Sequence, residues 1–148
     1  MSENIWRTYL SGEIHTDWRQ RIVDGSEGLP VEFFSPVTDH EASDLCGEKI
    51  LGAEDRTFWR DRKGAGINSI RTNILIETAD IVIVRFGEKY KQWNAAFDAG
   101  YACALGKPII TLHDEEHDHA LKEVDSAARA TARTPEQVVE ILKYVILK

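Results

Sequence analysis

Short apolar runs alternate with longer amphipathic segments along this chain. Runs of strand length lie at residues 5–10, 31–34, 81–84 and 109–112, and a weaker one lies near residues 128–132. The runs at 81–84 and 109–112 are continuous and rich in β-branched residues, which is typical of strands buried on both faces of a sheet. The pattern therefore predicts five strands, two of which are fully covered.

The segments between these runs carry apolar residues at helical spacing, which predicts amphipathic helices. For the last helix, Thr134 fits the N-cap and Pro135 fits the first helical position. Residues 52–66 are the least regular stretch, because Trp59 stands there among charges and glycines. We expect this stretch to form a long functional loop or a short broken helix. The expected helices cover residues 15–28, 39–51, 67–79, 93–105 and 135–147, with a further short helix after residue 119.

The alternation of strands and helices predicts an α/β fold in which helices cover both faces of a parallel sheet. We expect a single domain over residues 1–148. It should be a three-layer α/β/α sandwich, flavodoxin-like or Rossmann-like, with a five-stranded parallel sheet of order 2-1-3-4-5. Ligands bind such sheets outside the carboxyl ends of the strands, where the strand order reverses. The site is therefore expected in the loops at residues 11–17 and 85–93.

Composition narrows the function classes. The chain has 148 residues, 43% of them hydrophobic, and 18 Lys+Arg against 25 Asp+Glu give a net charge of −7. An acidic chain is a poor partner for nucleic acid, whose phosphates need a basic surface. No apolar run is long enough to cross a membrane, and no signal peptide is expected. Cys46 and Cys103 fit no metal or redox spacing, so we expect free thiols and a cytoplasmic location. We also expect no metal and no cofactor.

Unusual polar residues occur in the expected site loops and in the helix that follows the third strand. Asp98 stands among small and apolar residues, where a buried carboxylate without a partner is costly. Either a neighbouring donor satisfies it or it has a chemical role. Asn94 lies one turn earlier on the same helical face, and it either caps the helix or binds a ligand. The other candidates are Gly12, Glu13, His15, Trp18, Arg85, Trp93 and Tyr101.

Several segments resemble the nucleoside 2-deoxyribosyltransferases. Residues 79–84 (ADIVIV) and 97–108 (FDAGYACALGKP) resemble the strand and helix of that family's signature, and residues 9–12 (YLSG) resemble its opening turn. Residues 9–19 and 113–116 look like the YtoQ-type branch of this superfamily. The resemblance covers the whole chain in its order of elements. It implies a homo-oligomer, because the family's signature helix lies near a subunit interface.

The resemblance also implies chemistry at the N-glycosidic bond of a nucleoside. In the family a carboxylate attacks C1′ of a 2′-deoxynucleoside, and a second base or water then takes the sugar. Asp98 stands at the position of that nucleophile, and Tyr9 at that of a tyrosine that orients it. The chain departs from the family in having Asp98 for glutamate and Thr72 for an upstream acid. A non-catalytic module that binds a nucleoside or nucleotide is therefore the alternative.

Two further charged residues are open to alternative roles. Glu13 is expected to act as an acid beside Asp98, or else to form a salt bridge with Arg19 or Arg85. Arg85 is expected to bind a phosphate or carboxylate of a ligand, or else to pair with Glu88. Because Glu13 would repel a phosphate, a nucleoside or nucleobase is favoured over a nucleotide.

The remaining candidates are aromatic residues and histidines. Trp18 and Trp93 are expected to stack on a nucleobase, unless they belong to the core. The loop at residues 113–119 has the composition of a metal site. His117 and His119, however, are two residues apart rather than four, which favours a solvated acidic loop.

Overall fold

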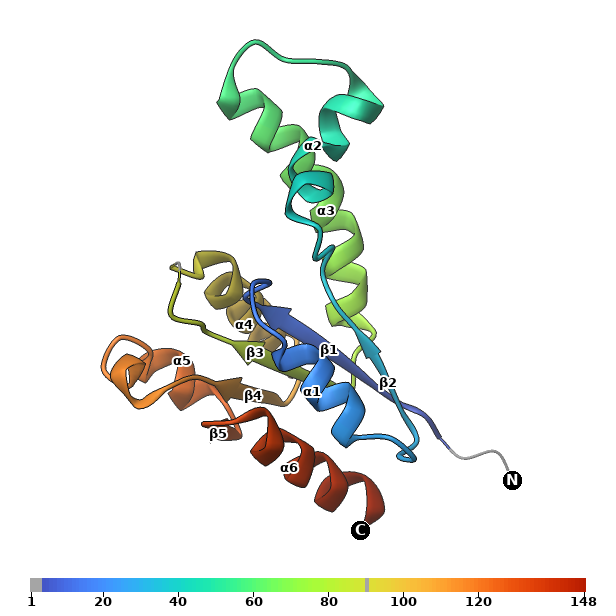
Figure 1. Cartoon of the computed structure of the whole chain (residues 1–148), viewed down its shortest axis with the longest axis vertical. Coiled ribbons are helices and arrows are strands. Elements are labelled where there is room, and N and C mark those ends of the chain that lie inside the picture. The colour runs from blue at the N-terminus through green and yellow to red at the C-terminus, as the bar shows by residue number, and fades with distance from the viewer. Residues whose placement is uncertain (1–3, 90) are drawn as a thin grey trace.

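The computed structural model describes residues 4–89 and 91–148 and contains a five-stranded parallel sheet (Figure 1). The strand order β2-β1-β3-β4-β5 places the reversal between β1 and β3, and it confirms the predicted fold class. Along this pair the register ends with Gly12 of β1 opposite Arg85 of β3. The strands are β1 (Trp6–Gly12), β2 (Val31–Phe34), β3 (Ile81–Arg85), β4 (Ile109–Leu112) and β5 (Ala130–Ala132).

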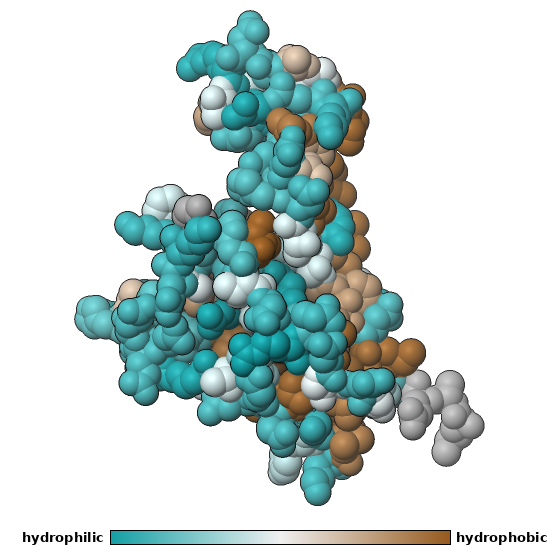
Figure 2. Space-filling model, in the orientation of Figure 1, coloured by the Kyte–Doolittle hydropathy of each residue, from teal (hydrophilic) through white to brown (hydrophobic). Residues whose placement is uncertain are grey.

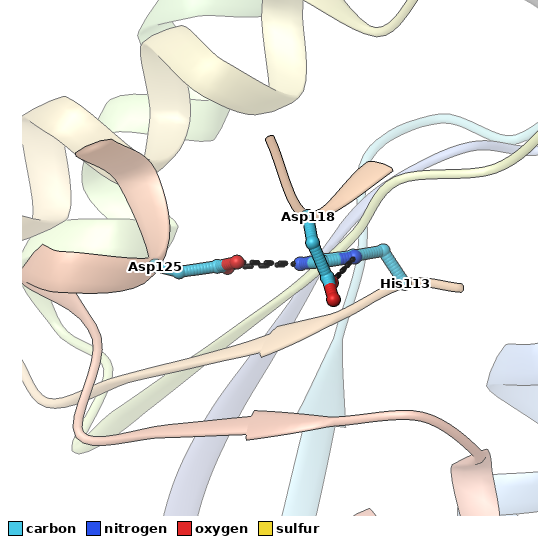
Figure 3. Close-up of side chains that lie close together, drawn as sticks. All are labelled: His113, Asp118 and Asp125. Atoms are coloured by element: carbon cyan, nitrogen blue, oxygen red, sulfur yellow. Dashed lines mark hydrogen bonds and ion pairs between the residues drawn. The ribbon is translucent and has the colours of Figure 1, made fainter. Parts of the chain in front are cut away.

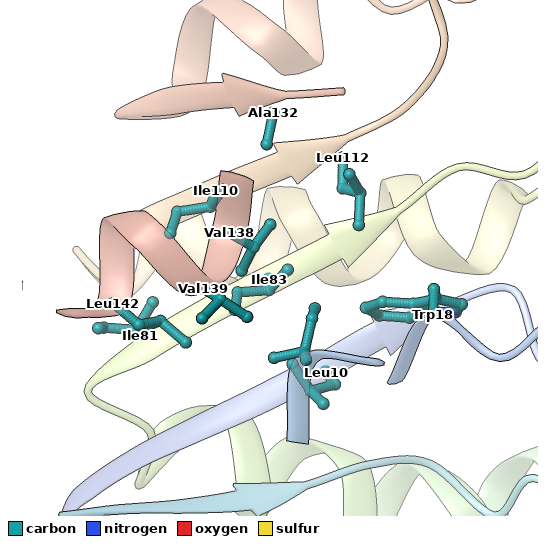
Figure 4. Close-up of a cluster of buried hydrophobic side chains, with 11 residues drawn as sticks. Leu10, Trp18, Ile81, Ile83, Ile110, Leu112, Ala132, Val138, Val139 and Leu142 are labelled. Atoms are coloured by element: carbon teal, nitrogen blue, oxygen red, sulfur yellow. The ribbon is translucent and has the colours of Figure 1, made fainter. Parts of the chain in front are cut away.

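Helices cover both faces of the sheet and complete three layers. α1 and α6 pack over the apolar cluster drawn in Figure 4, while α4, α5 and the end of α3 cover the opposite face. Ile81 and Ile83 of β3 join the first cluster, and Val82 and Val84 join the second, so this strand is apolar throughout. The helices are α1 (Trp18–Gly25), α2 (His40–Leu51), α3 (Thr57–Glu77), α4 (Trp93–Ala104), α5 (Lys122–Ala127) and α6 (Pro135–Leu147), with a short 3-10 helix η1 (Glu115–His117).

The expectation of a loop or a short broken helix at residues 52–66 is wrong in its second half, because α3 already begins at Thr57 and continues unbroken. α2 and the first half of α3 form an arm that extends beyond the sheet (Figure 1). Glycines here allow close packing: a Cβ on Gly47 would lie 2.5 Å from the backbone nitrogen of Gly64. No helix in the described ranges, α3 included, is long and apolar enough to span a membrane.

Candidate active site

β1 ends in a turn that only glycine fits. Gly12 has a φ of +118°, and a Cβ there would lie 2.1 Å from the backbone oxygen of Arg85 on β3. Glu13 donates its backbone N–H to the same oxygen at 3.3 Å. The loop after β1 is therefore fixed over the end of β3, at the edge of the sheet where a site is expected. Gly12 contributes backbone geometry to this edge, and its contact with a ligand stays a prediction.

The donor that satisfies Asp98 is Ser11, a residue that the sequence pattern does not single out. Ser11 is fully buried, and its Oγ donates to Asp98 Oδ2 at 2.7 Å. The two short side chains meet because α4 packs on the sheet through the buried residues Ala95, Ala99 and Ala102. Burial raises the pKa of Asp98, and the hydrogen bond from Ser11 opposes this effect without cancelling it.

Tyr9 lies two residues before Ser11 on the same side of β1. It is fully buried, and its hydroxyl has no hydrogen-bond partner among the described residues. Burial, followed by the charge of Asp98, raises the pKa of Tyr9 to about 12, while a side-chain contact with Thr72 on α3, too loose to meet hydrogen-bond geometry, lowers it. Buried polar groups almost always have partners, so a phenol that has only this weak contact and lies next to a carboxylate is a feature that a ligand would explain.

Both carboxylate oxygens of Glu13 bind within its own loop. Oε2 accepts the backbone N–H of His15 at 2.6 Å and that of Thr16 at 3.1 Å, and Oε1 accepts the hydroxyl of Thr16. Arg85 Nε lies 3.7 Å from Oε1. Burial acts to raise the pKa of Glu13, but the hydrogen bonds and the charge of Arg85 outweigh it and lower the pKa. This geometry favours the salt bridge with Arg85 over the role of an acid beside Asp98.

Arg19 and Trp18 close the same loop from α1. Arg19 donates to the backbone carbonyls of Leu10, Gly12 and Glu13 at 2.6–3.1 Å, and burial lowers its pKa to about 10. Trp18 is 1% exposed and donates its Nε1–H to the carbonyl of Glu13 at 2.8 Å. The guanidinium of Arg19 lies 4.5 Å from the Trp18 ring. The expectation that Trp18 stacks on a nucleobase is therefore wrong, because its ring is enclosed in the core.

The structure does not bring Tyr101 together with Asp98 in one crevice. The hydroxyl of Tyr101 donates to Glu77 Oε1 at 2.5 Å, at the end of α3 that precedes β3. α4 runs from the carboxyl edge of the sheet back to its amino edge, so a residue one turn after Asp98 lies nearer the opposite edge. Three other candidates keep exposed side chains near the carboxyl edge: His15, Trp93 and Asn94.

A cavity of about 420 Å³ lies at the same edge of the sheet, beside the start of α1 and the end of β2. Its walls include Leu10, Thr16, Arg19 and Phe33, which belong to the α1 side of β1. Asp98 is not among its lining residues, because that side chain meets β1 from the α4 side. The cavity and the Asp98 carboxylate are therefore separate features of one edge.

His113 follows β4 directly and is fully buried, which sets it apart from the acidic loop after it, and its contact with a ligand in the crevice stays a prediction. Its Nε2 lies 2.8 Å from Asp125 Oδ2 (Figure 3). Its Nδ1 lies 2.8 Å from the backbone oxygen of Asp114. Asp118 Oδ1 lies 3.8 Å from Nδ1, and Arg133 binds the two oxygens of Asp118 at 2.5 and 3.1 Å. Because these groups already bind one another through hydrogen bonds and ion pairs, we interpret the cluster as structural. It connects the end of β4 to α5 and to the loop between them.

Known proteins resemble this chain over nearly its whole length. A model of the family described as nucleoside 2-deoxyribosyltransferase YtoQ matches residues 9–146. The chain is 44% identical over 139 residues to the uncharacterized protein YtoQ of Bacillus subtilis (strain 168). The aligned residues make up 93% of this chain and 94% of that protein.

Solved structures share the fold at low sequence identity. A conserved protein from Enterococcus faecalis V583 has a TM-score of 0.61 and 13% identity, over 96% of this chain and 99% of that chain. A 2-deoxyribosyltransferase from Bacillus psychrosaccharolyticus has a TM-score of 0.55 and 16% identity, over 90% of each chain. At such low sequence identities the likeness shows a shared three-layer fold and not a shared activity.

Proposed function

The chain belongs to the nucleoside 2-deoxyribosyltransferase YtoQ family. From this membership we propose that it breaks the N-glycosidic bond of a 2′-deoxynucleoside, with Asp98 as nucleophile, and passes the sugar to another base or to water. One observation carries the proposal. Asp98 is a partly buried carboxylate at the reversal point of the sheet, and it lies near the buried hydroxyl of Tyr9, which none of the described residues binds at full hydrogen-bond geometry. A solved structure of similar fold is named as a 2-deoxyribosyltransferase, which supports this class of substrate.

The proposed reaction has two displacement steps. First, a carboxylate oxygen of Asp98 bonds to C1′ while the bond from C1′ to the base nitrogen breaks. The electron pair leaves with the base, which takes a proton from water, and a glycosyl ester remains on the protein. Second, a nitrogen of another base, or water, attacks C1′, releases the carboxylate and gives its proton to solvent. A carboxylate suits both steps because it is a nucleophile, a leaving group and an anion that stabilises positive charge on the sugar.

Tyr9 is proposed to orient the reacting groups. Because its pKa is raised to about 12, its hydroxyl stays protonated at neutral pH and can donate a hydrogen bond. The acceptor is then a ligand oxygen or the Asp98 carboxylate. Trp93 and Asn94, exposed at the start of α4, are proposed to contact the nucleobase and the sugar.

A non-catalytic module that binds a nucleoside is the second candidate function. It is favoured by the state of Glu13, whose two oxygens are bound by Thr16, His15 and Arg85. Glu13 is therefore not available as the acid that protonates a leaving base. Without Glu13 as the acid, a leaving base has to take its proton from water. A module that only binds a nucleoside needs no acid, so this arrangement of Glu13 suits it.

The test is mass spectrometry of the protein incubated with ribonucleosides and 2′-deoxynucleosides, with and without free bases. Asp98→Asn removes the nucleophile and is expected to lower base release or exchange at least about 1,000-fold. Asp61→Asn, on the exposed arm, is the matched control and is expected to keep full activity. Turnover that survives in Asp98→Asn would contradict the assigned nucleophile. Nucleoside binding without turnover in the unsubstituted protein would establish the binding module instead.

We also propose that the chain forms a homo-oligomer through the outer face of α3 and α4. Ile70 and Ile74 on α3 are 66% and 53% exposed, and Phe97 on α4 is 71% exposed. Figure 2 shows hydrophobic residues in brown along one side of the arm. A second copy of the same face would cover these side chains, which a monomer leaves in water.

A further inference from the structure

Asp98 is held through one of its two oxygens. Oδ2 accepts the hydroxyl of Ser11 at 2.7 Å, and no hydrogen bond from residues 4–89 or 91–148 reaches Oδ1. An oxygen that accepts a strong hydrogen bond has a lone pair engaged and is the weaker nucleophile of the two. The contact therefore makes the oxygens unequal and leaves Oδ1 as the one that is free to react.

The backbone fixes the position of Ser11 closely. Ser11 pairs with Val84 of the central strand β3, and Gly12 turns the chain immediately afterwards. Ser11 is fully buried, so its hydroxyl points into the layer between β1 and α4. A group on a paired strand moves less than a group on a loop, which makes Ser11 a firm anchor for a side chain of the facing helix.

We propose that Ser11 is a positioning residue, which holds Asp98 through Oδ2, favours its ionised form and directs Oδ1 towards C1′ of the nucleoside. This inference rests on the proposed function of Asp98. Ser11 is covered by protein and acts on the reaction through Asp98, without contacting the substrate.

The electrostatics of the pair support this role. Burial raises the pKa of Asp98, and the hydrogen bond from Ser11 is what opposes it. Without that hydroxyl the protonated acid, which cannot attack C1′, would persist to higher pH. Ser26 offers a matched comparison, because it is a buried serine whose hydroxyl has no hydrogen-bond partner in the described ranges.

The test compares Ser11→Ala, Ser11→Thr and the control Ser26→Ala in the full chain. The ¹³C NMR signal of the Asp98 carboxyl is followed through a pH titration, and turnover of a 2′-deoxynucleoside is measured over the same range. In Ser11→Ala we expect the Asp98 midpoint and the acidic limb of the rate profile to move to higher pH. We expect kcat to fall about 10- to 100-fold with little change in KM. Ser11→Thr keeps the hydroxyl and should restore both readouts, and Ser26→Ala should change neither.

The two readouts separate this inference from the function on which it rests. An unchanged Asp98 midpoint in Ser11→Ala overturns the positioning role, whether or not turnover is seen. Equal losses of activity in Ser11→Ala and Ser26→Ala, without a change in pH dependence, would also overturn it, because they indicate a loss of packing only. Absence of turnover in the unsubstituted protein overturns the proposed function, even where the Asp98 midpoint moves as expected.

Discussion

Replacement of Gly12 by alanine is expected to destabilise the protein by about 2–6 kcal/mol. A residue with a Cβ is strained at the φ of +118° found there, at a cost of about 1–3 kcal/mol. The new Cβ would also lie 2.1 Å from the backbone oxygen of Arg85. That oxygen belongs to the central strand β3 and can yield only if the β1–β3 pair shifts, which adds about 1–3 kcal/mol. The sum is a large part of the roughly 5–15 kcal/mol that stabilises a typical domain.

Urea unfolding of Gly12→Ala and Gly28→Ala separates these two costs. Gly28 also has a positive φ, +88°, but a Cβ there would meet no atom within 4 Å. Gly28→Ala therefore measures the backbone strain alone, and the difference between the variants measures the clash with β3. Equal destabilisation by the two substitutions would refute the reasoning, because the close approach of Gly12 to Arg85 would then cost nothing.

Two further predictions concern the loop after β1 and the outer face of α3. The pKa of Glu13 is lower in the folded protein than its ordinary value of 4.5. Ionised Glu13 therefore contributes to the free energy of unfolding above pH 4.5, and this contribution is lost as the pH falls through the lower pKa of the folded state. Glu13→Gln should cost about 1–3 kcal/mol near neutral pH and weaken the acid dependence of urea unfolding, and an unchanged dependence would contradict this. Ile70→Asp should lower the mass seen in sedimentation velocity, whereas Leu147→Asp, also at an exposed residue, should not. Equal masses for these two variants would count against the proposed oligomer face.

The strands were predictable from the sequence because burial on both faces leaves a simple pattern. Every residue of Ile81–Arg85 before the arginine faces one apolar cluster or the other, so the run is unbroken. The arm shows where that rule fails. The first turns of α3 pack on α2 in an arm beyond the sheet (Figure 1), so they carry no broad apolar stripe. Gly64 there serves close packing, although a glycine in a sequence suggests the end of a helix.

The sequence predicts where in the fold the candidate site lies, but not which of its side chains bind one another. Topology alone located it at the edge where β1 and β3 end, and the structure confirms that strand order. The partner of Asp98 is Ser11, 87 residues away, and no local spacing relates the two. The sequence leaves the place of Trp18 open for a similar reason, because a tryptophan after a strand has the same local pattern whether it is enclosed or exposed. The packing of α1 and α6 decides which of these holds.

The pKa values of Glu13 and Asp98, the two carboxylates at this edge, shift in opposite directions because different numbers of hydrogen-bond donors surround them. Glu13 accepts three hydrogen bonds from the described residues and lies near Arg85, which together lower its pKa and favour its ionised form. Among the described residues Asp98 accepts one hydrogen bond and keeps its other oxygen without a donor, and burial raises its pKa. This difference supports Asp98, rather than Glu13, as the proposed nucleophile. Arg85, 3.7 Å from Glu13, opposes the charge of that carboxylate, so the preference for an uncharged nucleoside over a nucleotide stays a prediction.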